Sequence, residues 1–314
     1  MMLTVGQERL PLSEINGDIK IKAVSFTANG KYIVGGGGGQ VEVWRVEDGE
    51  RMATMAVGDV RCLAVSKDDR WIAAGTGWGK VFAWDAETFK KVFSHREDLS
   101  VITSVDFSPD SDSTRLVTAS RNDTATVWDV ATRKKVLSLD HDHWVFAAKY
   151  SPQGHQIATA TAFSVRVWDS NDGRLLIDIP ITVNLWVNTG ILWSNNHLFV
   201  VSGSTIKQLE VSTGSAVSEW PVRNPIFTAV DQCIARSRHG KFIAYSAKGA
   251  VMFWDTSTHV HLGLIQLHPQ SIRSIALSPD DRFLAISANN KTIAIKDLWD
   301  VLPASYSTVS TVYC

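Results

Sequence analysis

A short hydrophobic stretch that ends in tryptophan and aspartate recurs along almost the whole chain. The clear copies are VEVWR, VFAWD, ATVWD, VRVWD and VMFWD, with the tryptophan at positions 44, 84, 128, 168 and 254. Two weaker copies, IKQLE and IAIKD, place Leu209 and Lys296 at the tryptophan position. Successive copies are 40 to 45 residues apart. A period of this length is typical of architectures in which each repeat is one supersecondary unit.

A second motif has the same period and is independent of the first. It is a serine or threonine that precedes a polar turn, as in FSPDS and LSPDD, and it also occurs seven times. These residues are Thr27, Ser66, Ser108, Ser151, Ser194, Ser237 and Ser278. Agreement between two unrelated signals over seven copies indicates a true internal repeat.

Each repeat contains four short hydrophobic runs. In the third repeat these are VITSVDFS, RLVTAS, TATVWDV and KKVLSL. Their alternation predicts strands, and the Asp, Asn, Ser and Pro residues between them predict turns. Four antiparallel strands form one propeller blade, which can bury both faces only against neighbouring blades. The sequence therefore predicts an all-β fold, a seven-bladed β-propeller of four-stranded antiparallel blades, as a single domain over residues 1–314.

These motifs resemble the WD40-repeat family, and the resemblance covers essentially the whole chain. In that family a histidine, a serine or threonine, an aspartate and the tryptophan form a hydrogen-bonded network within a blade. The third repeat resembles this pattern best. There the resemblance implies a structural network of His95, Thr118 or Ser120, Asp123 and Trp128.

Other repeats depart from the family pattern. The fourth has His141 and Trp168, but Phe163-Ser164 stands where the aspartate is expected. The seventh has His268, but Lys296 replaces the tryptophan. Packing between blades is therefore expected to stabilise most of the ring.

The N-terminal segment is expected to close the ring. Residues 7–15, QERLPLSEI, resemble an outer strand without inner ones, and we expect them to pair with TIAIKD in the seventh blade. This pairing would cover an edge that otherwise favours aggregation. Residues 300–314 would then form a short helical turn or a tail on the outside. The alternative is that this C-terminal tail closes the seventh blade instead.

Composition restricts the function. A net charge of −1 argues against binding to nucleic acid or to an anionic membrane. The three cysteines are too scattered for a disulfide framework or a zinc site. No signal peptide is evident, and no apolar run approaches the roughly 20 residues that span a bilayer. We expect a cytoplasmic or nuclear protein that is not secreted and is monomeric by itself.

No motif indicates catalysis, a metal or a cofactor. The run GGGGG at 35–39 lacks the lysine and the helix of a phosphate-binding loop, and glycine there allows a tight turn between strands. His259 and His261 alternate along a predicted outer strand, but two histidines leave a metal site underfilled. We therefore predict no enzyme activity, no cofactor and no metal.

One end of the ring is the remaining candidate site. In the family, the loops before each first strand and between the second and third strands share this end, and here they carry aromatic residues and arginines. Such side chains dominate protein interfaces because they bury a large area at a small entropic cost. The predicted partner-binding rim consists of Trp78, Arg121, Trp144, Phe163, Trp186, Phe227 and Arg273.

Trp144 and Trp186 allow a second interpretation. They stand in HWV and LWV, and in the family a tryptophan in such a sequence often packs against the neighbouring blade. Packing and exposure are therefore equal alternatives for these two residues.

The resulting hypothesis is a non-enzymatic scaffold or adaptor that binds a peptide or protein segment at the rim and the channel mouth. A propeller that binds a small molecule or a glycan through the rim tryptophans is an alternative. An enzyme or cofactor-bearing propeller would need clustered acids, histidines or metal ligands near the axis, and the sequence offers no such cluster.

Overall fold

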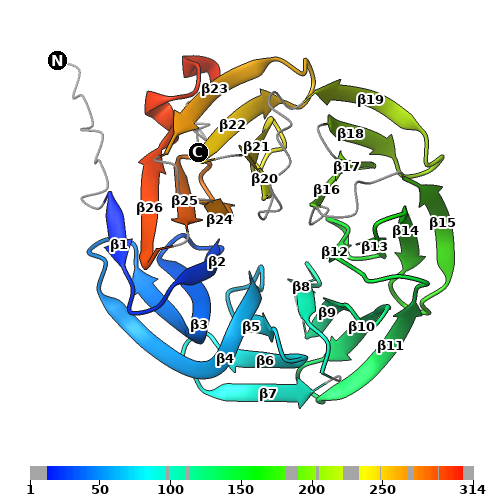
Figure 1. The fold of residues 1–314 in the computed structure, drawn as a ribbon, viewed down its shortest axis with the longest axis horizontal. Coiled ribbons are helices and arrows are strands. Elements are labelled where there is room, and N and C mark those ends of the chain that lie inside the picture. The colour runs from blue at the N-terminus through cyan, green and yellow to red at the C-terminus, as the bar shows by residue number, and fades with distance from the viewer. Residues whose placement is uncertain are drawn as a thin grey trace, which may run out of the picture.

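The chain folds into antiparallel β-sheets that stand around a common axis, which makes it a β-propeller (Figure 1). The computed structural model describes residues 13–96, 99–110, 114–181, 190–202, 205–221, 233–247, 249–267, 272–288 and 290–306. Among these residues there is no α-helix, and the two short 3-10 helices are η1 (Leu298–Asp300) and η2 (Ala304–Tyr306).

Four sheets each contain four strands that are consecutive in the chain. Their first strands lie innermost and their last strands lie on the perimeter (Figure 1). The first two of these sheets comprise β8 (Ile102–Phe107), β9 (Arg115–Ser120), β10 (Thr124–Asp129) and β11 (Lys134–Asp140), and β12 (Ala147–Tyr150), β13 (Gln156–Ala160), β14 (Ser164–Asp169) and β15 (Leu175–Pro180). The next two comprise β16 (Ile191–Ser194), β17 (His197–Ser202), β18 (Thr205–Glu210) and β19 (Ala216–Pro221), and β20 (Ile234–Arg236), β21 (Phe242–Ala247), β22 (Ala250–Asp255) and β23 (His261–Gln266).

A fifth four-stranded sheet joins the two ends of the described chain. It contains β24 (Ile272–Leu277), β25 (Phe283–Ala288), β26 (Thr292–Asp297) and the N-terminal strand β1 (Glu14–Asn16). In the register of β1 with β26, Ile15 lies opposite Ile293, and Ile295 N donates to the Ser13 carbonyl at 2.9 Å. The closing segment was expected at residues 7–15. Of that segment, Glu14 and Ile15 pair with β26, and residues 1–12 lie outside the described residues.

The remaining sheet has six strands: β2 (Ile21–Phe26), β3 (Tyr32–Arg45), β4 (Arg51–Val65), β5 (Trp71–Thr76), β6 (Lys80–Asp85) and β7 (Lys91–Arg96). The glycine run lies inside β3, where Gly39 has a φ of +114°. The ends of β3 lie beside each other, because Val46 N donates to the Lys31 carbonyl at 2.9 Å.

Strand β4 connects two parts of this sheet. Its first half pairs with β3 and its second half with β5. In Figure 1 it runs from the perimeter toward the centre of the ring. A hydrophobic cluster that includes Val41, Met55, Ile72 and Phe82 lies between these two parts. The six-stranded sheet therefore encloses hydrophobic core of its own.

The two sequence motifs have separate local roles. In five copies, at Thr27, Ser66, Ser151, Ser237 and Ser278, the serine or threonine hydroxyl accepts a backbone N–H from five residues further on, as Ser66 Oγ does from Trp71 N at 2.9 Å. The aspartate after the tryptophan accepts backbone N–H groups of the next turn, as Asp129 Oδ1 does from Thr132 N at 2.7 Å. Both are side-chain substitutes for a backbone turn bond, which explains why turn-forming residues recur at fixed offsets.

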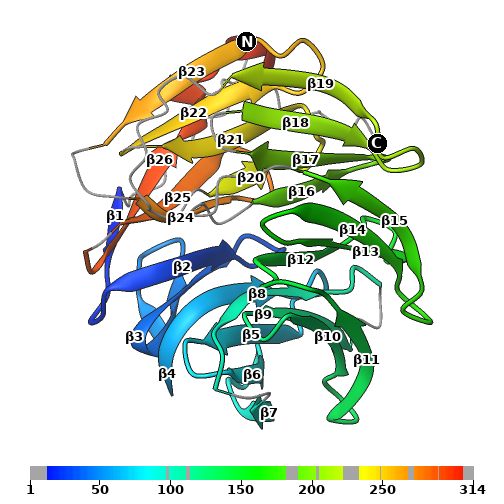
Figure 2. The ribbon, with the colours of Figure 1, turned by 45° about the vertical axis from the view of Figure 1, so that its right-hand side comes forward.

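The core lies between neighbouring sheets. Trp44, Trp84, Trp128, Trp168, Leu209 and Trp254 are all buried there. Each of them follows an irregularity in the pairing of its strand with the outer strand, for example between Val127 and Trp128. Lys296, the seventh residue of this series, is only partly buried. Figure 2 shows the stacking of the sheets from an oblique direction.

The C-terminal segment packs against the sheet of β20 to β23. Leu298 and Leu302 are buried in a cluster with Ile265 of β23. The Tyr306 hydroxyl donates to the Asp255 carboxylate. Residues 307–314, the rest of the expected tail, lie outside the described residues.

Candidate functional site

Three large aromatic side chains are exposed at the same end of the ring. They lie in the β5–β6 turn, the β11–β12 loop and the β13–β14 turn, which share one end because the strands alternate in direction. Trp78 is 64% exposed, Trp144 is 51% exposed and Phe163 is 47% exposed. The other large aromatics of the predicted rim, Trp186 and Phe227, lie outside the described residues.

Trp144 projects from a loop that is anchored on both sides. Val145 N donates to the Ser120 carbonyl at 3.0 Å, and Thr103 Oγ1 donates to the Val145 carbonyl at 2.6 Å. The Arg121 guanidinium carbon lies 5.0 Å from the centre of the Trp144 ring, within the range of a cation–π contact. Trp144 is therefore exposed, rather than packed against the neighbouring blade. Val145, and not Trp144, fills the space between the sheets, where it is fully buried.

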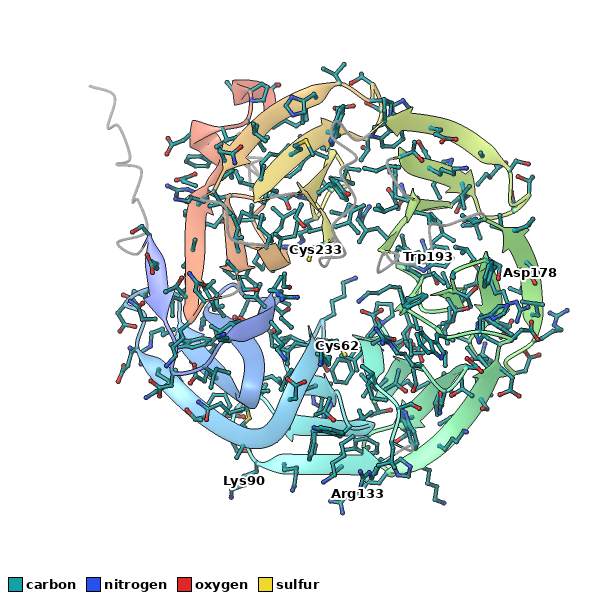
Figure 3. All side chains as sticks on the ribbon, in the orientation of Figure 1. Cys62, Lys90, Arg133, Asp178, Trp193 and Cys233 are labelled. Atoms are coloured by element: carbon teal, nitrogen blue, oxygen red, sulfur yellow. The ribbon has the colours of Figure 1, made fainter. Side chains whose placement is uncertain are left out.

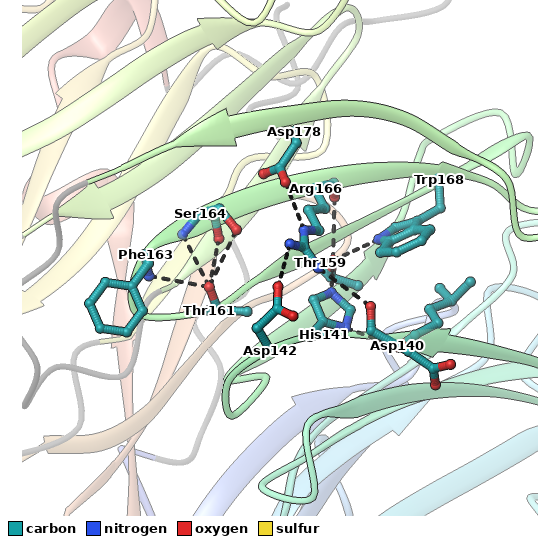
Figure 4. A network of polar contacts seen from close by, with 11 residues as sticks. Asp140, His141, Asp142, Thr159, Thr161, Phe163, Ser164, Arg166, Trp168 and Asp178 are labelled. Carbon is teal, nitrogen blue, oxygen red and sulfur yellow. Dashed lines mark hydrogen bonds and ion pairs between the residues drawn. The ribbon is translucent and has the colours of Figure 1, made fainter.

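Phe163 is held by its own turn. Thr161 Oγ1 accepts the backbone N–H groups of Phe163 at 3.2 Å and of Ser164 at 3.1 Å. The His143 ring lies 4.4 Å from the Phe163 ring, which places the β11–β12 loop beside the β13–β14 turn. Figure 4 shows Phe163 at one edge of a polar network. The fixed backbone means that little conformational freedom is lost if a partner covers the ring.

This loop and turn line a cleft of about 410 Å³, here called the rim cleft. At its base Arg166 Nη2 lies 2.9 Å from Asp142 Oδ2, and Arg166 Nε lies 3.0 Å from Asp178 Oδ2. The hydrogen bond from Arg166 lowers the pKa of Asp142. The rim cleft is therefore lined by charged groups beside an exposed aromatic ring. Its lining residues are Asp142, His143, Thr161, Phe163, Ser164, Arg166, Asp178 and Pro180.

Below the rim cleft, a buried network links the β11–β12 loop to the sheet (Figure 4). His141 Nδ1 lies 2.9 Å from the Leu139 carbonyl, so this nitrogen carries the proton. Burial lowers the pKa of His141 to about 4, which leaves the ring neutral and makes Nε2 an acceptor. Thr159 Oγ1, 2.8 Å from Nε2, donates to it and accepts from Trp168 Nε1 at 2.8 Å.

The predicted network of the third repeat is arranged differently. Trp128 Nε1 donates to Thr118 Oγ1 at 3.1 Å. His95 is exposed and lies with its ring 4.3 Å from the Trp128 ring. Ser120 Oγ accepts from Asn122 N at 3.3 Å, and Asp123 Oδ1 has no hydrogen-bond partner among the described residues. The histidine, threonine and tryptophan are linked by hydrogen bonds in the fourth repeat, through Thr159, a residue that the sequence analysis did not single out.

The other predicted rim residues lie apart from the rim cleft. Trp78 is next to Gly77, whose Cβ position would lie 3.2 Å from Arg61 Nε. Arg61 in turn pairs with Asp59 at 2.9 Å, so Trp78 adjoins a charged cluster. Arg273 is partly buried on β24, an innermost strand, rather than in a loop.

The described residues contain no group of three or more His, Cys, Asp or Glu side chains that could hold a metal ion. Cys62 and Cys233 lie near the centre of the ring, whereas Lys90, Arg133 and Asp178 lie on its perimeter (Figure 3). Burial raises the pKa of the Cys62 thiol to about 12. In the part of the chain that the structure describes, no helix has the length and apolar character needed to cross a membrane.

Comparisons with known proteins agree with this architecture. The family model described as "WD domain, G-beta repeat" matches residues 52–85, 87–129, 133–169 and 260–297. WD repeat-containing protein 1 of Mus musculus is 24% identical over 278 residues, which cover 82% of this chain and 44% of that protein. The ribosome biogenesis protein WDR12 homolog of Drosophila persimilis is 31% identical over 189 residues, which cover 53% of this chain and 42% of that protein. The chain thus spans less than half the length of these curated relatives.

A solved structure has the same fold. A chain in the crystal structure of the mitotic checkpoint complex superimposes with a TM-score of 0.77 over 95% of each chain. The two sequences are 16% identical, so this likeness concerns the fold alone.

Proposed function

Because the chain belongs to the WD40-repeat family, whose propellers generally bind protein partners, we propose that it is a non-enzymatic scaffold or adaptor. It binds a peptide or protein segment at the rim. The observation that carries this proposal is the pair of half-exposed rings, Trp144 and Phe163, on a loop and a turn that are fixed by hydrogen bonds. Rigid exposed aromatics are the side chains that most often carry the binding energy of an interface.

The proposed division of roles follows from the chemistry of the rim. Trp78, Trp144 and Phe163 supply apolar area, while Arg121 and the charged rim cleft select the partner by electrostatic complementarity. Trp186, Phe227 and Arg273 remain proposed members of the rim.

We further propose that the ring has seven blades in one domain over residues 1–314, with tryptophan-type positions at 44, 84, 128, 168, 209, 254 and 296. The six-stranded sheet then counts as two blades, with β3 supplying two strands of the first blade and β4 shared between both. Seven hydrophobic clusters of described residues support this count, one for each junction between neighbouring blades. The β1–β26 pairing supports closure by the N-terminal segment.

A location in the cytoplasm or nucleus is also proposed. One relative is named as a ribosome biogenesis protein, which supports an intracellular site of action. Imaging of the tagged full chain in cells of its source would test this location, and export into the medium would contradict it.

Affinity capture from a lysate of the source organism, followed by mass spectrometry, tests the binding function. The double variant Trp144→Ala with Phe163→Ala should lose the partners of the wild type while its melting temperature changes little. Val217→Ala with Leu264→Ala is a matched control, since it removes two exposed apolar side chains on outer strands. An unchanged partner set in the rim variant would contradict the proposal.

A further inference from the structure

Four innermost strands contain a β-bulge at the same position of the repeat. In β2 the pairing shifts between Ile21 and Ala23, which leaves Lys22 as the extra residue. The pairings of β4 with β5, β8 with β9 and β24 with β25 shift in the same way. All four extra residues stand five positions before the Ser or Thr of the second motif, and the other three are Arg61, Thr103 and Arg273. A bulge takes a residue out of the ladder and re-aims its side chain.

Three of these four residues are cations on neighbouring strands. They are Lys22, Arg61 and Arg273, here called the cation row. Strand β2 lies between β24 and the second half of β4 in the ring (Figure 1). Val24 N of β2 donates to Ser274 Oγ of β24 at 3.2 Å, which links these two strands. The cation row therefore follows the inner wall of the ring over three adjoining strands.

Asp59 joins two members of the cation row. Its Oδ1 pairs with Lys22 Nζ, and its Oδ2 lies 2.9 Å from Arg61 Nη2. The Lys22 side chain is 31% exposed and the Arg61 side chain is 48% exposed. An ammonium group carries three N–H donors and a guanidinium group five, so both side chains have donors beyond those that face Asp59. A ligand from solvent can therefore reach Lys22 and Arg61.

The cation row adjoins an exposed tryptophan of the predicted rim. Gly77 N donates to the Asp59 carbonyl at 2.8 Å, which attaches the β5–β6 turn to the strand that carries Arg61. Trp78 is the next residue of this turn and is largely exposed. Accessible cations and an apolar ring therefore lie side by side at the rim end of the ring.

The charges of the cation row favour an anionic ligand. Its three cations and Asp59 together leave an excess of two positive charges, although the net charge of the whole chain is −1. Low-dielectric walls around like charges strengthen their field and raise the local concentration of the opposite charge. A Lys or Arg side chain of a partner would be repelled, whereas two carboxylates would balance the excess. The guanidinium fork also matches the geometry of a carboxylate.

We propose that the cation row binds an acidic segment of a protein partner. Asp or Glu carboxylates of that segment accept from Lys22 and Arg61, Arg273 adds to the positive field, and Trp78 covers a neighbouring apolar side chain. This inference rests on the proposed binding of a protein segment at the rim, and it names the chemistry of that segment. It concerns different residues from the Trp144 and Phe163 pair.

Binding of a labelled hexaglutamate peptide to the purified full chain is the first test, measured by fluorescence anisotropy. Hexaglutamate should bind, and its affinity should fall as the salt concentration rises, because screening weakens the attraction. Hexaglutamine of the same length should not bind. A phosphoserine peptide of matched charge distinguishes the two kinds of anion. Binding of that peptide without binding of hexaglutamate would overturn the assignment to carboxylates, and binding of no anionic peptide would overturn the site.

Substitutions locate the binding on the chain. Lys22→Gln and Arg61→Gln should each weaken hexaglutamate binding about 10-fold, the effect of one lost charge-assisted hydrogen bond. Arg133→Gln changes the net charge equally but lies on the perimeter, so it is the matched control and should have no effect (Figure 3). Equal weakening by Arg133→Gln would mean that the peptide senses only net charge, and this outcome would overturn the proposal.

The double variant Trp144→Ala with Phe163→Ala separates this site from the aromatic pair. It should bind hexaglutamate as the wild type does, even if it loses its partners from a lysate. Loss of hexaglutamate binding in this double variant would overturn the assignment to the cation row. Retained lysate partners in the double variant would instead contradict the role of the aromatic pair and leave the peptide result unchanged.

Discussion

The third and fourth repeats have similar motifs but different polar networks. In both, the tryptophan indole donates to a threonine hydroxyl on the neighbouring strand, from Trp128 to Thr118 and from Trp168 to Thr159. Of these two repeats, only the fourth adds a buried histidine. His141 is 9% exposed and is hydrogen-bonded at both ring nitrogens. His95 in the third repeat lies exposed against its tryptophan.

The difference follows from the register of the histidine. His141 precedes the turn residue Ser151 by 10 positions, whereas His95 precedes Ser108 by 13. His141 therefore falls just after β11, where its own N–H donates to the Asp123 carbonyl at 2.9 Å and turns the ring inward. His95 falls inside β7 opposite Val81, and its ring lies 4.3 Å from the Trp128 ring without a place in the hydrogen-bonded network. The two histidines thus hold different positions relative to the outer strand, and only His141, which follows the strand, joins the buried network.

The largest expected difference between the two repeats concerns the threonines. Thr159→Val removes the donor to His141 and the acceptor of Trp168, and should lower the free energy of unfolding by about 2–4 kcal/mol. Thr118→Val removes the acceptor of the Trp128 indole N–H and should lower the free energy of unfolding by about 1–2 kcal/mol. Equilibrium unfolding in urea measures both values. Equal losses would mean that His141 adds nothing to the network.

The pH dependence of stability should separate the two histidines. The pKa of His141 in the folded protein, about 4, is below the roughly 6.5 of an unfolded chain. The unfolded state therefore binds the extra proton first, and stability falls as the pH drops from about 6.5 toward 4. The slope from this one group is at most about 1.4 kcal/mol per pH unit.

Unfolding at a series of pH values in wild type and His141→Gln measures this contribution. The variant should lose most of the slope. His95→Gln should lose less of it, because desolvation and Lys135 also lower the pKa of His95 but its ring is exposed. A wild-type slope that persists in His141→Gln would assign the acid sensitivity to other groups.

Much of the fold could be predicted because its signals are local. Strand alternation and the turn-forming Ser and Asp residues each act within a few positions, and the resemblance to the WD40 family is confirmed. The continuity of β4 over Arg51–Val65 was not predicted. The sequence Gly58-Asp59 resembles a turn, but the backbone there continues from the outer strand of one repeat into the first strand of the next.

The site was harder to predict because it depends on contacts between repeats. The HWV sequence around Trp144 is compatible with packing or exposure. The outcome was decided by the bond from Val145 to Ser120 in the preceding repeat and by Arg121 over the ring. Likewise Thr159 is one of many threonines, and only the position of His141 makes it the centre of a network. Such pairings depend on three-dimensional register, which a repeat period of 40 to 45 residues does not specify.

The smallest expected difference concerns the arginines of the two repeats. Arg166 is 18% exposed at the side chain and lies between Asp142 and Asp178, so Arg166→Gln should lower the free energy of unfolding by about 1 kcal/mol. Arg121 lies over the face of the half-exposed Trp144 ring. Arg121→Gln should lower the free energy of unfolding by about 0.5 kcal/mol or less. Urea unfolding at low and at high salt distinguishes the two causes. High salt should reduce the stability loss of Arg166→Gln more than that of Arg121→Gln, because screening weakens the two ion pairs of Arg166. An effect at Arg166 that does not change with salt would mean that the side chain stabilises the fourth repeat by packing rather than by charge.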